Sequence, residues 1–474
     1  RRALPPKISL GNDNMKIIVS NRIHLHGAPL ALARQLEQHF TVDNPAFVSA
    51  EKMGRYTGDH EPTLRFCKVD NGALILPRGA VDFVHGRALA FSSVEAIDNR
   101  LTLPEIDLTF RGSLRAYQQQ ACEDATKAGH SVIEAGTGSG KSVIALAIIA
   151  ARRQPTLIIV HTKELLHQWR DRIEQFLGVE AGLIGDGQFD VRPVTVAIVN
   201  TARNRLDELV DRFGHVVVDE CHRVPATLFT ETVTAFPARY LLGLSATPYR
   251  RDGLDNLIGS FVGENRVRVD MKILQQVGAV LRPKVIERET DFAYCYLDDY
   301  QDMITALVEN PHRNESIAAD IRQQSGRGRT TLVVSDRVGH LRRISELAAV
   351  GGARLLTGKT PKRERLAIVA DLNAGKVPVL YSTLSLIGEG FDCPGLDTLL
   401  IASPIRYSGR LKQVVGRVMR PADGKEPVVI DYVDSRVSLL EHQAKARRRV
   451  YLELKAARYA PRHSPEQRTA LAAT

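Results

Sequence analysis

Two long regions of the chain alternate short, β-branched apolar runs with helical segments. The first region starts near residue 106 and the second near residue 282. Such alternation is typical of parallel sheets whose strands are joined by crossover helices. The sequence therefore predicts two α/β domains of similar size. The expected strands are residues 131–133, 156–160, 194–199, 215–218 and 240–244 in the first domain, and 330–335, 354–356, 377–381, 398–402 and 427–433 in the second.

The two ends of the chain follow other patterns. Short strands and one helix before residue 105 predict a small α+β unit, in which Asn71-Gly72 marks a hairpin between strands at 64–69 and 73–77. From residue 435 the chain is rich in Arg and Lys, which predicts a basic helix that frays into a tail. The expected domains are residues 1–105, 106–254, 255–434 and 435–474.

The helix expected after the strand at 156–160 has an apolar stripe. Leu166, Trp169, Ile173 and Phe176 recur at helical spacing. Trp169 is the single tryptophan of the chain, and its place on the stripe favours a core position over a platform for base stacking.

Composition narrows the function classes. The chain has 474 residues, 44% hydrophobic and 25% charged, with no apolar run near the ~20 residues that span a bilayer, so no membrane partner is expected. A net charge of +10 suits either a solvated basic surface or a polyanion partner, and charge alone does not decide. The start, Arg1-Arg2-Ala3, lacks a Met and suggests a processed chain or a piece of something longer.

Cysteine and histidine usage argues against a disulfide framework and against a zinc site. Five cysteines are dispersed without a C-x-x-C pair, and His24 and His26 have no ligand pair at metal-binding spacing beside them. We therefore expect the protein to lie in a reducing compartment.

Residues 131–149 have the pattern of a phosphate-binding loop. A β-branched run leads through a glycine-rich stretch to Gly140-Lys141-Ser142, and helix formers follow. Glycines lack a Cβ, so that backbone N–H groups can close on an anion at the positive end of the helix. Lys141 is expected to reach the β- and γ-phosphates of ATP, and the Ser142 hydroxyl to bind Mg²⁺. The usual pattern begins with Gly where this chain has Ala135. The expected loop residues are Ala135, Gly136, Thr137, Gly138, Ser139, Gly140, Lys141 and Ser142.

A second motif, which is acidic, lies about 80 residues downstream of the phosphate loop. An apolar run at 216–218 ends in two adjacent carboxylates, Asp219 and Glu220. Asp219 can hold Mg²⁺ through its water shell, and Glu220 can polarise the attacking water. A strand that runs into a polar turn is the alternative, and the upstream phosphate loop argues against it.

Three spaced motifs connect these residues to a family. The sequence DECH at 219–222, followed by LSATP at 244–248, resembles the DExH-type superfamily 2 helicases, and QVVGRVMR at 413–420 resembles the sixth motif of that family, Q-x-x-G-R-x-x-R. The resemblance covers roughly residues 114–433. It implies two tandem RecA-like parallel-sheet domains with ATP between them, here with a small α+β N-terminal domain and a basic helical C-terminal tail.

The resemblance also implies roles for individual residues. Arg417 and Arg420 would act at the γ-phosphate, with Arg420 as a candidate arginine finger, a feature that accelerates hydrolysis roughly 10³–10⁵-fold. The implied catalytic residues are Lys141, Asp219, Glu220, Gln413, Arg417 and Arg420, and further nucleotide contacts are Arg115, Gln118, Gly388 and Asp392. The implied nucleic-acid contacts are Thr162, Lys163, Asn200, Thr201, Arg250, Ser335 and Thr383, and the residues coupling hydrolysis to movement are His222, Ser245 and Thr247.

Two segments resemble one branch of the superfamily. Residues 246–252 lie where xeroderma pigmentosum group B-type DNA helicases carry Arg-Glu-Asp, although Arg251 replaces the acidic middle residue. The sequence LPRG at 76–79 resembles the small DNA-binding domain of bacterial and phage relatives. The segment after Gly253 is too short for the inserted thumb of that branch.

The leading hypothesis is an ATP-dependent DNA helicase or translocase that uses ATP and Mg²⁺ and moves 3′ to 5′ on single-stranded or forked DNA. The resemblance also implies a cytoplasmic protein, bacterial or phage-like and associated with DNA, and leaves open a fusion or complex with other DNA-processing domains. RNA stays open as a track, because the family contacts the phosphodiester backbone more than base edges. The alternatives are a duplex translocase such as a restriction-type motor subunit, and an ATP-gated clamp on DNA. A small-molecule kinase would not explain the second α/β domain.

Overall fold

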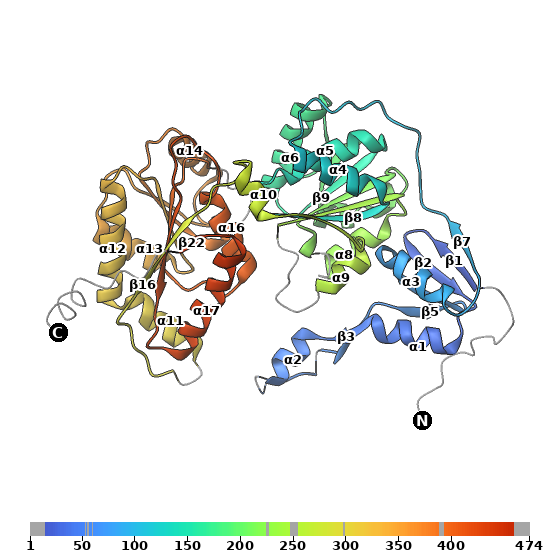
Figure 1. Ribbon diagram of the computed structural model, residues 1–474, viewed down its shortest axis with the longest axis horizontal. Coiled ribbons are helices and arrows are strands. Elements are labelled where there is room, and N and C mark those ends of the chain that lie inside the picture. Colours follow the sequence, from blue (N-terminus) through green and yellow to red (C-terminus); the bar gives the residue numbers. More distant parts are fainter. Residues whose placement is uncertain are drawn as a thin grey trace. The chain divides into compact units, whose positions relative to one another are not determined.

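The computed structural model describes residues 15–52, 54, 56–58, 60–223, 227–246, 255–296, 299–387 and 393–458 (Figure 1). Four expected site residues, Thr247, Arg250, Gly388 and Asp392, lie outside the described residues. The chain divides into two compact units between Val269 and Asp270, with the loop residues Gly136–Ser139 grouped with the second. Within the described residues, no helix is long and apolar enough to cross a membrane.

The N-terminal part of the first unit is a five-stranded sheet with the strand order β5-β6-β2-β1-β7. Asn71 and Gly72 have positive φ angles of 47° and 76° and join β5 to β6, which confirms the predicted hairpin. The single strand predicted at 64–69 is wrong, because β4 pairs with β3 in a separate sheet and β5 starts anew. The elements are β1 Met15–Val19, β2 Arg22–His26, α1 Leu30–His39, β3 Thr41–Asp43, α2 Pro45–Lys52, β4 Thr63–Arg65, β5 Lys68–Asp70, β6 Ala73–Pro77, η1 Arg78–Ala80, α3 Val81–Leu89 and β7 Val94–Asp98.

This N-terminal part is fixed to the rest of its unit by a buried arginine. Arg78 is 2% exposed, and its Nη1 donates to the carbonyl oxygens of Phe236 at 2.9 Å and Ala238 at 2.8 Å. Burial, with a smaller effect of Arg100, lowers the pKa of Arg78 to about 9, so that the side chain is still a cation at neutral pH. Because a buried carbonyl needs a donor, this one side chain satisfies backbone groups more than 150 residues away in sequence.

The first α/β domain is an eight-stranded sheet with the strand order β11-β10-β12-β9-β13-β14-β8-β15. All pairings except β10 with β11 are parallel. The elements are α4 Ala116–Lys127, β8 His130–Ala135, α5 Lys141–Arg152, β9 Thr156–Val160, α6 Lys163–Leu177, β10 Gly182–Gly185, β11 Gln188–Phe189, β12 Val194–Ile198, α7 Val199–Arg203, η2 Leu206–Glu208, β13 His215–Asp219, η3 Cys221–Arg223, α8 Thr227–Ala235, β14 Tyr240–Ser245, α9 Asp255–Phe261 and β15 Asn265–Val269.

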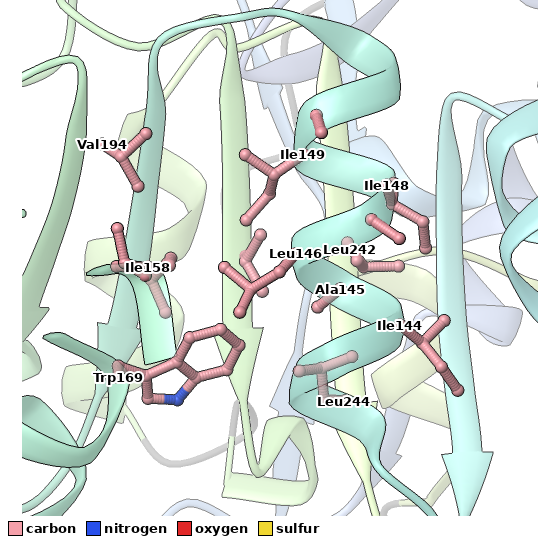
Figure 2. Packing of buried hydrophobic residues seen from close by; sticks show 14 of the residues in the cluster. Ile144, Ala145, Leu146, Ile148, Ile149, Ile158, Trp169, Val194, Leu242 and Leu244 are labelled. Atoms are coloured by element: carbon pink, nitrogen blue, oxygen red, sulfur yellow. The ribbon is translucent and has the colours of Figure 1, made fainter. Parts of the chain in front are cut away.

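Successive residues of the central strands point to opposite faces of this sheet, and both faces are buried. Ile158 packs with α4, α5 and α6, whereas the preceding Leu157 packs with α7, α8 and α9. Figure 2 shows α5 laid across the first face, with Leu146 and Ile149 turned toward Ile158 and the indole of Trp169 beside them. Burial on both faces explains why the strands are continuous apolar runs in the sequence.

The boundary expected between residues 254 and 255 is wrong. β15 pairs in parallel with β8, and the buried carboxylate of Glu134 accepts hydrogen bonds from Arg266 and Arg268 at 2.7 Å each. These contacts place residues up to Val269 in the first unit. The two valines of this edge strand alternate with arginines over only five residues, Asn265–Val269, which is too short a pattern for the sequence to reveal a strand.

The second unit contains a seven-stranded parallel sheet with the strand order β18-β19-β17-β20-β21-β16-β22. The C-terminal helix α17 is part of this unit and not a tail, because Leu440, Ala444 and Val450 are buried and β22 adds a strand beside β16. The elements are α10 Met271–Gln276, β16 Lys284–Glu289, α11 Tyr300–Glu309, α12 Pro311–Gly326, β17 Thr331–Ser335, α13 Val338–Ala348, β18 Arg354–Leu356, α14 Lys362–Asn373, β19 Val379–Thr383, α15 Leu384–Ile387, β20 Thr398–Ile401, α16 Ser408–Val418, β21 Val428–Val433, α17 Ser438–Glu453 and β22 Ala457–Arg458.

Candidate active site

The carboxyl ends of four neighbouring strands meet at one edge of the first sheet. β9, β13, β14 and β8 lie side by side in this order and are parallel, and they end at Val160, Asp219, Ser245 and Ala135. In parallel α/β sheets, ligands bind at this edge. The fold therefore brings the predicted phosphate loop and the predicted acidic motif to the same place.

The loop after β8 has the backbone that its glycines predict. Gly138 and Gly140 have φ angles of +89° and +79°, values that side chains other than glycine rarely adopt. A Cβ on Gly140 would lie 2.4 Å from Nε2 of Gln118. Lys141 opens α5, and its Nζ donates to the carbonyl oxygen of Ala135 at 3.0 Å. The side chain of Lys141, the predicted phosphate ligand, thus lies folded back against the start of the phosphate loop.

The two carboxylates at the end of β13 differ in environment. Asp219 is 7% exposed, and its Oδ1 accepts the N–H of Glu220 at 3.0 Å. Burial, and then the charge of Glu220, raise the pKa of Asp219. For Glu220, burial acts upward, but His222 and Lys141 outweigh it and hold the pKa below its usual range. Glu220 therefore stays ionised, as a group that polarises water must be.

The backbone of Glu220 is in the left-handed region, with a φ of +51°. Such a conformation costs about 1–3 kcal/mol for a residue with a side chain and persists only where the surroundings enforce it. The neighbours of Glu220 provide that enforcement: its N–H is held by Asp219, and its Oε2 lies 3.2 Å from Nδ1 of His222. Nδ1 of His222 also lies 3.3 Å from Oγ of Ser245, at the end of the adjacent strand.

Two family models match the chain. Residues 111–250 match the model described as "Type III restriction enzyme, res subunit", and residues 313–422 match "Helicase conserved C-terminal domain". The first match contains the phosphate loop and the acidic motif, and the second contains the motif at 413–420.

Relatives and solved structures agree with these matches. The "Probable helicase D10" of Escherichia phage T5 is 28% identical over 374 residues, which cover 76% of this chain and 79% of the phage protein. The "DNA 3'-5' translocase XPB2" of Sulfurisphaera tokodaii is 25% identical over 361 residues, 68% of this chain and 81% of that protein. The structure of S. cerevisiae Dbp5 bound to RNA and ADP BeF3 has a TM-score of 0.54 at 15% identity, covering 73% of this chain and 89% of Dbp5, and thus has the same fold.

The chain belongs to the superfamily 2 helicases. Its two parallel sheets are the tandem RecA-like domains of this superfamily, as the sequence predicts, and the protein is an ATP-hydrolysing enzyme.

Gln118 of this helicase lies directly against the phosphate loop. Its side chain is buried, and its Oε1 accepts the N–H of Arg115 at 2.9 Å, which caps the start of α4. Because the Nε2 group of Gln118 fills the space beside Gly140, this predicted nucleotide contact lies directly against the phosphate loop.

Helix α6 contributes two contacts to this site that sequence reasoning missed. Trp169 is fully buried, as predicted, but its Nε1 also donates to Oδ2 of Asp219 at 2.9 Å. Nη1 of Arg172 donates to Oγ of Ser142 at 2.7 Å. The helical stripe made Trp169 a core residue in the sequence, and nothing there signalled that its one polar atom meets Asp219.

The donor set fits a hydrated divalent cation bound together with nucleotide phosphates. Ser142 and Asp219 offer the hard oxygen ligands that Mg²⁺ prefers, and Mg²⁺ sites commonly use one or two protein ligands plus phosphates and water. Among the described residues, no group of three or more His, Cys, Asp or Glu could hold a metal by itself. The phosphates of the nucleotide and water would therefore complete the coordination of the cation.

The family motif of the second RecA-like domain lies on α16 and just after it. Arg417 is 7% exposed, and its Nε donates to the carbonyl oxygen of Ile387 at 3.2 Å. Gln413 lies on the same helix, and Arg420 follows it, with Nζ of Lys425 donating to its carbonyl oxygen at 2.8 Å.

The residues expected to contact nucleic acid have mixed surroundings. Thr162 caps α6, accepting the N–H of Leu165 at 3.2 Å. Lys163 is exposed and forms an ion pair with Asp186 at 2.6 Å. Asn200 and Thr201 lie in α7.

Ser335 differs from the other predicted contacts in its burial. It is fully buried, and its Oγ lies 2.9 Å from Nδ1 of His340. Thr383, at the end of β19, is half-buried, with its Oγ1 lying 3.3 Å from Oγ of Ser385.

A basic cavity of about 500 Å³ lies where the N-terminal part meets α8 and α9. Arg22, His24, Arg65 and Lys68 line it from the N-terminal side, together with the acidic Asp70. Two aromatic rings also line the cavity, Phe66 from the N-terminal side and Phe261 from α9. They meet edge-on, with ring centroids 5.4 Å apart.

Proposed function

We propose that the protein is an ATP-dependent DNA helicase or translocase that hydrolyses Mg²⁺-bound ATP and moves 3′ to 5′. The observation that carries the proposal is the convergence of Lys141, Asp219 and Glu220 at one sheet edge, with His222 between Glu220 and Ser245. The name of the XPB2 relative, a DNA 3'-5' translocase, supports both the track and the direction.

The residues at the edge suit distinct steps of hydrolysis. The loop amides and Lys141 would bind the phosphates, and the ionised Glu220 would take a proton from the attacking water. When bound, Mg²⁺ would neutralise phosphate charge as transfer proceeds. Ser142 and Asp219 are the residues that would hold it. From the second domain, Arg417 and Arg420 keep the γ-phosphate role that the family resemblance implies.

Coupling to movement is proposed for the His222–Ser245 contact. His222 faces Glu220 and Ser245 with one nitrogen, at 3.2 and 3.3 Å, and cannot donate fully to both. A change at Glu220 during hydrolysis would therefore change the contact with Ser245. Ser245 ends β14, and the predicted coupling residue Thr247 follows it two positions later in the chain.

Movement on duplex DNA without strand separation is the second candidate. It is favoured by the match of residues 111–250 to the restriction-enzyme model. The two candidate functions share the hydrolysis site and differ only in whether the DNA strands are separated.

The test is steady-state ATP hydrolysis without nucleic acid and with single-stranded DNA, duplex DNA or RNA, with Lys141→Ala as the inactive control. Stimulation by DNA is expected, and a rate indifferent to all three polymers would reject the proposal. A strand-displacement assay on 3′-tailed and 5′-tailed duplexes then gives polarity, and displacement of a triplex-forming strand without unwinding would establish the second candidate. Stronger stimulation by RNA would reassign the track.

A further inference from the structure

One face of α6 is directed at both residues that would ligate the metal. Trp169 and Arg172 are three positions apart and thus lie one turn apart on the same face of the helix. The first donates to Asp219 at 2.9 Å and the second to Ser142 at 2.7 Å. The two recipients come from different motifs, 77 positions apart by the difference of their numbers, so a single helix spans both.

Trp169 fixes the orientation of the Asp219 carboxylate. Its indole is fully buried in the core between α5, α6 and β9, as Figure 2 shows, so its N–H cannot swing away. Oδ1 of Asp219 is already held by the N–H of Glu220. With one donor on each oxygen, the carboxylate cannot rotate, and its remaining lone pairs keep one direction.

Arg172 supplies a positive charge at the other ligand. Its guanidinium donates to the Ser142 hydroxyl and lies in the field of Asp219. A divalent cation on the same oxygen would be a second positive charge within a few ångströms, and like charges at that range repel strongly in a partly buried site. The guanidinium and the metal therefore compete for Ser142.

We propose that Trp169 and Arg172 are positioning residues of the metal–nucleotide site, in which Arg172 holds the Ser142 hydroxyl and offsets the charge of Asp219 until metal-bound nucleotide arrives. This inference rests on the proposed function only in that the site binds Mg²⁺ and a nucleotide. If so, removal of the two side chains should change the half-saturating Mg²⁺ concentration in opposite directions.

The test measures the affinity for a fluorescent ADP analogue at a series of Mg²⁺ concentrations, and without Mg²⁺. Arg172→Met is expected to lower the half-saturating Mg²⁺ concentration and to weaken metal-free binding, each by roughly tenfold, because a charged partner is removed. Arg172→Lys keeps the charge and should restore most of the wild-type ratio. Trp169→Phe keeps the packing without the donor and should raise the half-saturating Mg²⁺ concentration about tenfold.

Arg170→Met is the matched control, since Arg170 lies on the same helix and pairs with the exposed Asp171. It should leave both affinities unchanged. In addition, Trp169 is the only tryptophan, so its emission should change when Mg²⁺ joins bound ADP, and this change should be lost in Asp219→Asn.

The outcomes separate this inference from the proposed function. Equal weakening of metal-bound and metal-free binding in Arg172→Met, or a lowered Mg²⁺ need in Trp169→Phe, would overturn the inference while nucleotide binding by the wild type stands. A wild type that binds no nucleotide, or that is unaffected by Lys141→Ala, would reject the proposed function as well.

Discussion

The docking of the N-terminal part can be tested with one methyl group at Gly79. A Cβ at this position would lie 2.6 Å from the carbonyl oxygen of Gly259, 2.7 Å from that of Ser260 and 2.9 Å from the backbone nitrogen of Gly263. All three are backbone atoms, so that no side chain can rotate away. Gly79→Ala must therefore push α9 and the N-terminal part apart.

The cost follows from these distances. Overpacking of a rigid contact typically destabilises a protein by about 1–3 kcal/mol. In a unit of this size, each kcal/mol lowers the melting temperature by about 2–4 °C. We expect Gly79→Ala to melt about 2–12 °C below the wild type, with the neighbouring Arg78 hydrogen bonds to Phe236 and Ala238 weakened as well.

Gly86→Ala is the matched control. Gly86 is exposed in the middle of α3, seven positions away by number, and a Cβ there meets nothing within 4 Å. Alanine is a better helix former than glycine by about 0.8–1 kcal/mol, so this variant should be slightly more stable than the wild type. Thermal unfolding and amide exchange at Ala238 measure the difference. Equal stability of the two variants would refute the tight docking of Gly79 on α9.

Three further predictions concern the site, the cavity and the second domain. Glu220→Gln should lower the DNA-stimulated turnover roughly 10²–10⁴-fold with nucleotide affinity retained, and a loss below tenfold would remove Glu220 as the base. Lys68→Glu, in the basic cavity, should weaken DNA binding about uniformly across sequences without lowering basal hydrolysis, measured by fluorescence anisotropy at fixed salt; unchanged affinity would exclude the cavity from the track. Burial, and then the charge of Arg313, lower the pKa of His340 to about 3. Between about pH 6.5 and pH 3 the histidine is therefore protonated in the unfolded chain and neutral in the folded protein. Stability is therefore fully present above about pH 6.5 and is lost as the pH falls, by about 2 kcal/mol at pH 5 in denaturant titrations, and His340→Gln should reduce this loss; an unchanged pH dependence in that variant would contradict the assignment.

The sequence by itself determined the parts of this protein that depend on local pattern. The alternation of apolar runs and helices predicts both parallel sheets, because strands buried on both faces must be continuously apolar. The hairpin at Asn71-Gly72 and the turn of the phosphate loop follow from residues that tolerate positive φ. The carboxylates Asp219 and Glu220 are placed by the strand that precedes them.

The tertiary structure decided whatever depends on partners far apart in the chain. The sequence offered Trp169 as a core residue, and only the packing of α6 against α5 and β12 turns its N–H toward Asp219, 50 positions away. Likewise, the arginines of the edge strand β15 bind Glu134 of the first sheet, and Arg78 finds its acceptors on a loop more than 150 positions later. A single polar atom or a buried arginine leaves no periodic signal in the sequence, because its meaning depends on which groups the fold brings within hydrogen-bond distance.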